Sequence, residues 1–319
     1  MTETRRTKKG HYLPKFYLAG FTAGGTEKSE LLVFDRELGQ VRSGKPISVG
    51  YERYFYALPG KDPDSFEQAL AKDEDAIAAI VRAVDGAPGT QPDERALETL
   101  VYFTALMHLR MPAFREHHLP QISQHYDQIA ELWMVAPHAW ERYVESARKN
   151  GKQPVSRQRF ERARKAVLEG KLRFEAQPAE HLRIMADHIA DFTKILLRRT
   201  WSVVVAPEGT GGFVTCDMPV ALYWNVEGAP AIPPAFGSPD AEVFMPLTRR
   251  SGLVGRAATD IVIIEGTSMV AHLNTKIINE SRRFIFAPDR GFGWLSNRGT
   301  ADGAALEARM REMVEEGQR

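Results

Sequence analysis

Side chains that can move protons or hold anions occur at widely separated positions in this chain. His11 can take or give a proton near neutral pH, because its ordinary pKa is about 6.5. Arg110 can clamp a carboxylate or a phosphate through two parallel hydrogen bonds. A pocket that combined these groups with carboxylates would suit general acid–base hydrolysis of a phosphodiester. The candidate catalytic residues are His11, Tyr12, Glu52, Arg110 and Asp217.

Glu67 and Glu74 are candidate metal ligands on a predicted helix. Mg²⁺ or Mn²⁺ would suit them, because hard cations prefer oxygen ligands. The two acids are seven residues apart, about 10.5 Å along one helix face, so other groups would have to lie between them. The sequence gives no nucleotide or flavin signature: it lacks GxxxxGK[ST], GxGxxG after a strand, HExxH and GxSxG. The sequence therefore does not identify a cofactor, and Mg²⁺ or Mn²⁺ is the candidate.

The candidate substrate-binding side chains are of three kinds: aromatic, amide and basic. The basic ones come from residues 157–173, which predict either a solvated helix face or a surface that contacts nucleic-acid phosphates. A second basic segment, residues 1–9, carries four basic side chains against Glu3. The candidate substrate-binding residues are Tyr56, Asn274, Arg157 and Arg164.

The same residues also fit a buried structural network. A histidine ahead of a helix often caps it, and an aspartate before proline often closes a turn by accepting hydrogen bonds from backbone amides. A buried arginine commonly neutralises a glutamate, because an unpaired buried charge costs ~3–5 kcal/mol. Glu67 also fits a helix-capping acid. A hydrolase, a binding protein and a structural network are therefore three open interpretations.

The single cysteine, Cys216, excludes an intramolecular disulfide and a thiolate metal cage, and we expect it to be a small core residue. His181 and His188 lie seven residues apart without a third ligand at a sensible spacing. No apolar run approaches the ~20 residues that span a bilayer. With a net charge of +1, no global field draws the chain to nucleic acid or anionic lipid. We predict a cytoplasmic protein with no membrane partner.

Short strand-like runs flank a helical middle region. After an opening helix at about 14–22, strands are expected at 31–34 and within the extended segment 45–57. Helices are expected from 64 to 86, from about 92 to 109, and at 122–134, 138–149, 156–169 and 179–199, with Pro112 and Pro120 as breaks. Later strands are expected at 201–205, 212–215, 221–224, 242–245, 260–264 and 283–286, with a helix at 267–281. The glycine-rich residues 209–212 predict a hairpin turn.

This pattern predicts an α+β fold in which the N- and C-terminal segments form a mixed or antiparallel sheet around a helical middle region. We expect a flexible basic arm over residues 1–10 and a single domain over 11–300. Within that domain the helical part covers about 64–200 and the β-rich part about 200–290. A C-terminal helix covers 301–319. The alternative is two subdomains with a boundary near residue 200.

Several motifs resemble the DUF4238 family, bacterial proteins of unknown function, from residue 10 to about 287. The start resembles its His-Tyr-x-Pro motif, and later segments resemble its Glu-x-x-Phe-Tyr, Arg-x-Pro, Phe-x-Thr-Ser-Asp-x-Pro and Leu-Asn patterns. Cys216 and Met218 depart from the serine and asparagine that the family shows there. The matching residues are His11, Tyr12, Pro14, Glu52, Tyr56, Glu67, Glu74, Arg110, Pro112, Asp217, Pro219, Leu273 and Asn274.

The resemblance implies an α+β domain and supplies no reaction. From the residue types and the basic segments, our first functional prediction is a nuclease-like hydrolase that acts on nucleic acid in bacterial defence or toxicity. The alternative is a non-enzymatic protein that recognises a small anionic ligand or a partner protein. These hypotheses depend on whether the first ordered residues meet the strand that ends at Asp217.

Overall fold

The computed structural model describes residues 9–58, 64–226, 228–257, 262–264 and 266–317. The chain divides into two compact units. The first unit combines Met1–Ala113 with Ile184–Arg319, and the second is Phe114–Arg183. Two helices, α4 (Pro112–Val135) and α7 (Pro178–Leu196), contain the boundaries between the units.

One four-stranded sheet of the first unit joins the two ends of the chain. Its order is β3-β2-β10-β6, and every neighbouring pair is antiparallel. The four consecutive apolar residues at the start of β2 explain its place inside the sheet, because a central strand is covered on both faces, and Val33 lies opposite Phe286. The predicted α+β fold with a sheet built from both ends is therefore confirmed. The strands are β2 (Leu31–Asp35), β3 (Gln40–Gly44), β6 (Thr215–Cys216) and β10 (Phe284–Ala287).

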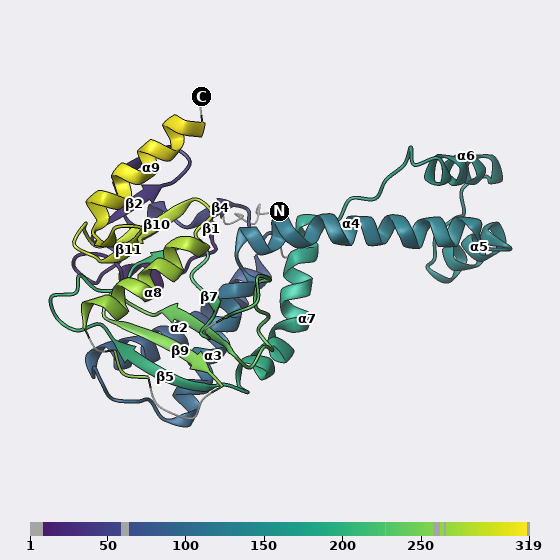
Figure 1. The fold of residues 1–319 in the computed structure, drawn as a ribbon. Helices are drawn as coiled ribbons and strands as arrows, with labels where there is room; N and C mark the ends of the chain where they lie inside the picture. Colours follow the sequence, from purple (N-terminus) through teal and green to yellow (C-terminus); the bar gives the residue numbers. More distant parts are fainter. Residues whose placement is uncertain (1–8, 59–63, 227, 258–261, 265, 318–319) are drawn as a thin grey trace. The chain divides into compact units, whose positions relative to one another are not determined.

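A second four-stranded sheet comes entirely from the C-terminal half. Its order is β5-β9-β8-β7, again antiparallel throughout. Helix α8 (Thr267–Glu280) packs against β6 of the first sheet, against β7, and against the hairpin that follows (Figure 1). The strands are β5 (Thr200–Val205), β7 (Ala221–Trp224), β8 (Ala241–Pro246) and β9 (Ser251–Arg256), and the hairpin is β11 (Trp294–Ser296) with β12 (Gly299–Ala301).

The opening segment is anchored in this core. Strand β1 (Lys9–His11) pairs with β4 (Tyr51–Arg53), and the short helix α1 (Lys15–Ala19) follows. The Tyr17 hydroxyl lies 2.6 Å from the Thr215 hydroxyl and donates to the Pro246 carbonyl at 2.9 Å. Residues 1–8 of the predicted basic arm lie outside the described residues, and β1 begins at Lys9.

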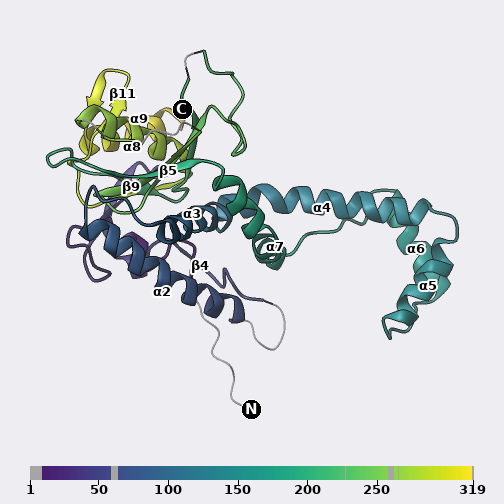
Figure 2. The ribbon, with the colours of Figure 1, turned by 90° about the horizontal axis from the view of Figure 1, so that it is seen from below.

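Two long helices of the first unit lie side by side (Figures 1 and 2). Helix α2 (Ser65–Gly86) carries apolar residues on one face, and α3 (Glu94–Leu109) is buried along much of its length. Asp93 caps α3 by accepting a hydrogen bond from the Ala96 amide at 2.8 Å. A final helix, α9 (Gly303–Gly317), buries Leu306 and Met310.

The second unit is helical. Besides most of α4, it contains α5 (Ala139–Lys149) and α6 (Arg157–Leu168). Its small core is aromatic: Phe160 lies 5.2 Å from Tyr143 and 5.3 Å from Trp140 between ring centroids. Offset and edge-on ring contacts of this kind stabilise a small core beyond the area they bury.

Several expected elements are wrong in detail. Helix α4 continues through Pro120, because a water-exposed helix can leave one carbonyl to solvent. The segment 45–57 is not continuously extended: a 3-10 turn η1 (Pro46–Ser48) precedes β4, and Tyr54 is left-handed at φ 58°. Residues 209–212 connect β5 and β6 of different sheets, so they form no hairpin. Residues 260 and 261 of the strand expected at 260–264 lie outside the described residues, and 262–264 form no strand.

Candidate functional site

Arg110 sits at the C-terminal end of α3 and is 1% exposed. Its Nε donates to the Tyr56 hydroxyl at 2.9 Å, and its Nη1 donates to the Glu74 carboxylate at 2.9 Å. Its Nη2 donates to the main-chain carbonyl of His11 at 2.7 Å. All three nitrogens therefore bind the protein's own groups. Arg110 joins α2 and α3 to the opening strand.

Tyr56 completes this cluster. Its hydroxyl donates to the His11 carbonyl at 3.1 Å while it accepts from Arg110. Burial raises the pKa of Tyr56 to about 12, so the phenol stays protonated near neutral pH. The ring stacks on Phe66 at 5.9 Å between centroids. The candidate metal ligand Glu74 is held in an ion pair here, because its carboxylate neutralises Arg110.

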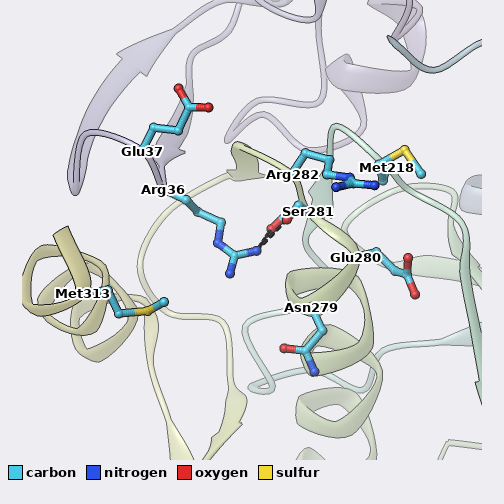
Figure 3. Close-up of a pocket in the computed structure, with 8 residues that line it drawn as sticks. All are labelled: Arg36, Glu37, Met218, Asn279, Glu280, Ser281, Arg282 and Met313. Carbon is cyan, nitrogen blue, oxygen red and sulfur yellow. Dashed lines mark hydrogen bonds between the residues drawn. The ribbon is translucent and has the colours of Figure 1, made fainter. Parts of the chain in front are cut away.

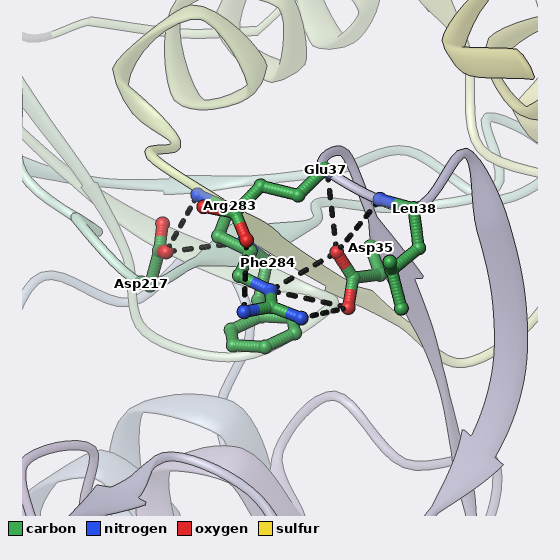
Figure 4. Close-up of polar contacts among 6 residues, drawn as sticks. All are labelled: Asp35, Glu37, Leu38, Asp217, Arg283 and Phe284. Atoms are coloured by element: carbon green, nitrogen blue, oxygen red, sulfur yellow. Dashed lines mark hydrogen bonds and ion pairs between the residues drawn. The ribbon is translucent and has the colours of Figure 1, made fainter. Parts of the chain in front are cut away.

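Asp217 binds the backbone that leads into β10 (Figure 4). Its Oδ1 accepts from the Arg282 amide at 2.9 Å, and its Oδ2 accepts from the Arg283 and Phe284 amides at 2.8 and 3.0 Å. Burial raises the pKa of Asp217, and the amide donors work in the opposite direction by stabilising the carboxylate. The local turn closure expected for Asp217 is therefore wrong, because these amides lie 65 to 67 residues further along the chain. The carboxylate instead links the end of β6 to the segment that enters β10, which is a structural role.

A second carboxylate nearby is neutralised by an arginine (Figure 4). Arg283 donates from Nε and Nη2 to the buried Asp35 at 3.1 and 2.9 Å, and its Nη1 lies 2.8 Å from Glu37. Asp35 also accepts from the amides of Glu37 and Leu38. Acids and arginines of this region therefore pair with each other.

Tyr12 is the candidate whose functional group stays available. The residue is 6% exposed, and its hydroxyl makes no hydrogen bond to another described residue. The hydroxyl is not one of the fully buried unpaired atoms, so solvent reaches it. Burial raises the pKa of Tyr12, and the charges of Asp217 and Glu52 add to this, so the phenol is a donor at neutral pH. It lines a half-enclosed cavity of about 190 Å³. The walls are Tyr12, Val33, Arg42, Ser48, Val49, Gly50, Tyr51, Phe284 and Phe286.

Local backbone geometry shapes this cavity. Gly50 has φ 65°, and a Cβ there would lie 2.9 Å from that of Leu13. Its carbonyl accepts from the Leu13 amide at 3.1 Å, which holds the turn before β4 against the segment that carries Tyr12. Glycine is required because the turn is left-handed and the two segments are in contact. We call this space the Tyr12 cavity.

His11 is held neutral beside the Tyr12 cavity. Burial lowers the pKa of His11 to about 4, and the nearby charges of Lys15, Lys9 and Arg110 act in the same direction. Its Nε2 is buried without a hydrogen-bond partner, and its ring lies 5.5 Å from that of Tyr51. An imidazole with this pKa is a poor general acid at neutral pH.

We expect acid to destabilise the protein through His11. Unfolded histidine takes up a proton near pH 6.5, whereas the folded side chain resists protonation until about pH 4. The stabilising contribution is therefore complete above pH 6.5 and is lost as the pH falls toward 4. Between pH 7 and pH 5 the loss is about 1–2 kcal/mol, reduced for the partial exposure of the ring. Urea unfolding at both pH values measures it.

A matched pair of variants isolates the histidine. His11→Gln should lose less stability between pH 7 and pH 5 than the wild type, because glutamine does not titrate. His188→Gln, which replaces an exposed histidine of α7, should keep the wild-type difference. Equal differences in His11→Gln and the wild type would contradict the assignment.

Asn274 and Cys216 are structural groups in the core. The Asn274 carbonyl accepts from the Val214 amide at 3.0 Å, and its amide donates to the Gly212 and Gly293 carbonyls at 3.0 and 2.9 Å. Asn274 is 0% exposed, so it faces no solvent-filled space. Burial raises the pKa of the Cys216 thiol well above its usual range, which leaves little thiolate for nucleophilic attack.

The structure brings together only part of the predicted site. His11, Tyr56, Glu74 and Arg110 form one bonded cluster, and Tyr12 is influenced by Glu52 and Asp217. Glu67 lies in the first turn of α2. Asn274 lies in α8 and bonds to Gly212, Val214 and Gly293, none of which belongs to that cluster.

The basic candidates belong to the second unit. Arg157 is exposed at the start of α6. Arg164 donates from Nε to the Met134 carbonyl at 2.7 Å, and its Nη1 lies 3.5 Å from Glu161. Their part in a substrate site stays a prediction.

Three arginines near cavities were missed from the sequence. Arg42 of β3 lines the Tyr12 cavity, and the described residues give its guanidinium no hydrogen-bond or ion-pair partner. Arg36 and Arg282 line a second, more open cavity of about 540 Å³ (Figure 3). There Arg36 donates to the Ser281 carbonyl at 2.5 Å, at the C-terminal end of α8. No motif marks these positions, because only folding places them beside a cavity.

Within the described ranges no three His, Cys, Asp or Glu side chains are grouped so that they could hold a metal ion. The same residues include no helix that is long and apolar enough to cross a membrane. The predicted Mg²⁺ or Mn²⁺ dependence therefore has no assembled ligand set to support it in this part of the chain.

The fold and the paired polar clusters define an α+β protein whose predicted site residues are largely bound to one another. Residues 9–291 match the family described as protein of unknown function (DUF4238), and the chain belongs to this family. A comparison with curated proteins finds no match. A comparison with solved structures finds none either.

Proposed function

We propose that this protein binds a small, planar, anionic molecule in the Tyr12 cavity without chemically changing it. The observation that carries the proposal is the Tyr12 hydroxyl, which is protonated, makes no hydrogen bond to another described residue and lies where solvent reaches it in the cavity. A charged ligand acceptor that replaced the solvent at this donor would gain a hydrogen bond of about 1.5–3 kcal/mol. A few polar groups beside apolar and aromatic walls are typical of ligand sites.

The chemistry of the cavity wall defines the ligand class. Tyr51 and Phe284 offer aromatic surfaces for a flat ring. Arg42 offers a guanidinium for a carboxylate or another anionic group, since it has no acidic partner in the described chain. The volume of about 190 Å³ is similar to that of a cavity that takes a single six-membered ring. A one-ring aromatic carboxylate meets all three requirements.

The first prediction, a nuclease-like hydrolase, is less well supported. That mechanism needs a titratable His11, an available Arg110 and free carboxylates. In the structure His11 is held neutral, Arg110 binds three of the protein's own groups, and Asp217 binds three amides. Acids neutralised by arginines beside a small cavity fit the binding alternative better.

Benzoate is the probe for the proposed site. We expect it to bind with a dissociation constant of about 0.1–1 mM, the range for a nine-atom ligand that makes one ring contact and one charged contact. Benzamide should bind at least tenfold more weakly because it lacks the charge, and cyclohexanecarboxylate should also bind weakly because it is not planar. Titration followed by NMR chemical shifts gives the three constants.

Two substitutions locate the binding. Tyr12→Phe and Arg42→Gln should each weaken benzoate binding about tenfold or more, because each removes a hydrogen bond to a charged group. The matched controls Tyr54→Phe and Arg82→Gln change exposed residues of the same types and should leave the constant unchanged. Unchanged binding by Tyr12→Phe, or no binding by the wild type, would reject the site.

The same preparation tests hydrolysis. Labelled RNA and DNA are incubated with the protein and with His11→Ala in the presence of Mg²⁺ or Mn²⁺. If the wild type cleaves nucleic acid and the His11→Ala variant does not, the hydrolase interpretation is favoured over the binding protein. Intact nucleic acid in all samples, together with benzoate binding, is the result we expect.

A further inference from the structure

The second unit concentrates positive charge that the whole-chain balance conceals. The unit, Phe114–Arg183, contains thirteen Lys and Arg against nine Asp and Glu, a net +4 in a chain whose total is +1. Within it, residues 142–173 contain eleven Lys and Arg against three Glu. The three acids pair with Lys149, Arg164, Lys165 or Lys171. Among the described residues, six of the remaining cations have no carboxylate partner: Arg142, Arg148, Lys152, Arg157, Arg159 and Arg162.

Large apolar side chains are exposed in the same unit. Near the end of α4, Leu132 is 68% exposed and Val135 is 59% exposed, with the exposed Trp133 between them. Leu168, Leu172 and Phe174, at and after the end of α6, are exposed as well. Single exposed apolar residues are ordinary, whereas a group of this size indicates an interaction surface.

Specific contacts place the apolar and basic groups next to each other. The Arg142 guanidinium lies 5.8 Å from the centroid of the Trp133 ring. Arg164 donates to the Met134 carbonyl at 2.7 Å, which holds α6 against the end of α4. The Phe174 amide donates to Asp127 of α4 at 2.8 Å, so the segment after α6 runs along the same helix. We call this combined area the α4–α6 surface.

In place of the absence of a membrane partner expected from the whole-chain charge and hydropathy, we propose that the α4–α6 surface binds the surface of a membrane that contains anionic lipids. Aliphatic side chains such as Leu132, Val135 and Leu168 gain by entering the acyl boundary, and the surrounding cations gain by meeting acidic headgroups. Nucleic acid would use the cations and Trp133 but would leave these aliphatic groups in water. A second copy of the chain would bring two strongly positive surfaces together, which repel each other.

Vesicle sedimentation tests the proposal with the full chain. We expect the protein to sediment with vesicles of phosphatidylcholine that contain 30% phosphatidylserine, and not with phosphatidylcholine alone. Binding should fall at least tenfold between low and high salt, because the electrostatic attraction is screened. No sedimentation with the acidic vesicles would overturn the proposal.

Two matched pairs of variants separate the components. Leu132→Ser combined with Val135→Ser should weaken vesicle binding about tenfold, and Arg157→Gln, Arg159→Gln and Arg162→Gln together should weaken it more. Two control variants change exposed groups of the first unit and should leave vesicle binding unchanged. The apolar control combines Leu38→Ser with Ile232→Ser, and the basic control combines Lys72→Gln, Arg82→Gln and Arg95→Gln. Circular dichroism checks that each variant is folded.

Competing partners give distinct results. Labelled single- and double-stranded DNA and RNA test for a nucleic-acid surface. If the protein binds one of them tightly, and if the Leu132→Ser, Val135→Ser variant binds it equally well, the proposal is overturned. A dimer in light scattering that the same apolar variant dissociates would show self-association and also overturn it. Vesicle binding that needs both the apolar and the basic residues supports it.

Discussion

Arg110→Met is expected to lower the free energy of unfolding by about 3–5 kcal/mol. Methionine fills a similar volume but leaves the Glu74 carboxylate without its cation, and it leaves the His11 carbonyl and the Tyr56 hydroxyl without a donor. Arg110 is 1% exposed and the Glu74 side chain 25% exposed, so water can replace only part of these contacts. Urea unfolding at pH 7 measures the loss.

A double-mutant cycle separates the ion pair from the rest of the cluster. Arg110→Met with Glu74→Gln should recover part of the loss, because the second change removes the uncompensated charge. Arg110→Lys should still lower the stability, since one ammonium group cannot reproduce the three hydrogen bonds that the planar guanidinium makes in different directions. Arg82→Met, on the exposed face of α2, is the control. A loss below about 1 kcal/mol for Arg110→Met would contradict the buried-network interpretation.

The second large effect is expected for Asp217→Ala, with a loss of about 3 kcal/mol or more. The substitution leaves the amides of Arg282, Arg283 and Phe284 unpaired, and each unsatisfied buried donor costs about 1–3 kcal/mol. The stability of Asp217→Asn should lie between those of the wild type and Asp217→Ala, because the single side-chain oxygen of asparagine can still accept two of the three hydrogen bonds.

Thermal and urea unfolding of both Asp217 variants provide the measurement. Asp240→Ala, an exposed loop aspartate, is the matched control and should change the stability by less than about 0.5 kcal/mol. If Asp217→Ala were as stable as the wild type but lost benzoate binding, the carboxylate would belong to the ligand site and not to the contact between β6 and the backbone that enters β10.

Much of the fold could be predicted from local patterns. The strand of Leu31–Asp35 and the helix of Ser65–Gly86 lie where their apolar spacing placed them. Strand β9 was missed because Gly252 and Gly255 interrupt its pattern. The structure gives the reason: a Cβ at these positions would lie 2.6 Å from the Phe244 ring and 2.7 Å from the Trp201 ring. Long-range packing requires these glycines, and a local pattern does not contain that information.

The candidate site could be predicted by residue type but not by role. The sequence picked out Arg110, Glu74 and Asp217 as interacting polar groups, and it weighed a network against a site. Only the three-dimensional arrangement distinguishes them, because burial and partner atoms decide whether a charge is available. Arg42 was missed because a lone arginine in a polar strand carries no distinctive local signal.

The first sheet has a consequence for biosynthesis. Asp35 and Arg283, which pair across β2 and β10, are 248 residues apart in the chain. At a translation rate of about 5–20 residues per second, the apolar strand Leu31–Asp35 would wait roughly ten to fifty seconds on the ribosome before its partner is made. Nascent chains of this protein would therefore be natural clients for chaperones, and truncated chains that end before residue 284 should aggregate.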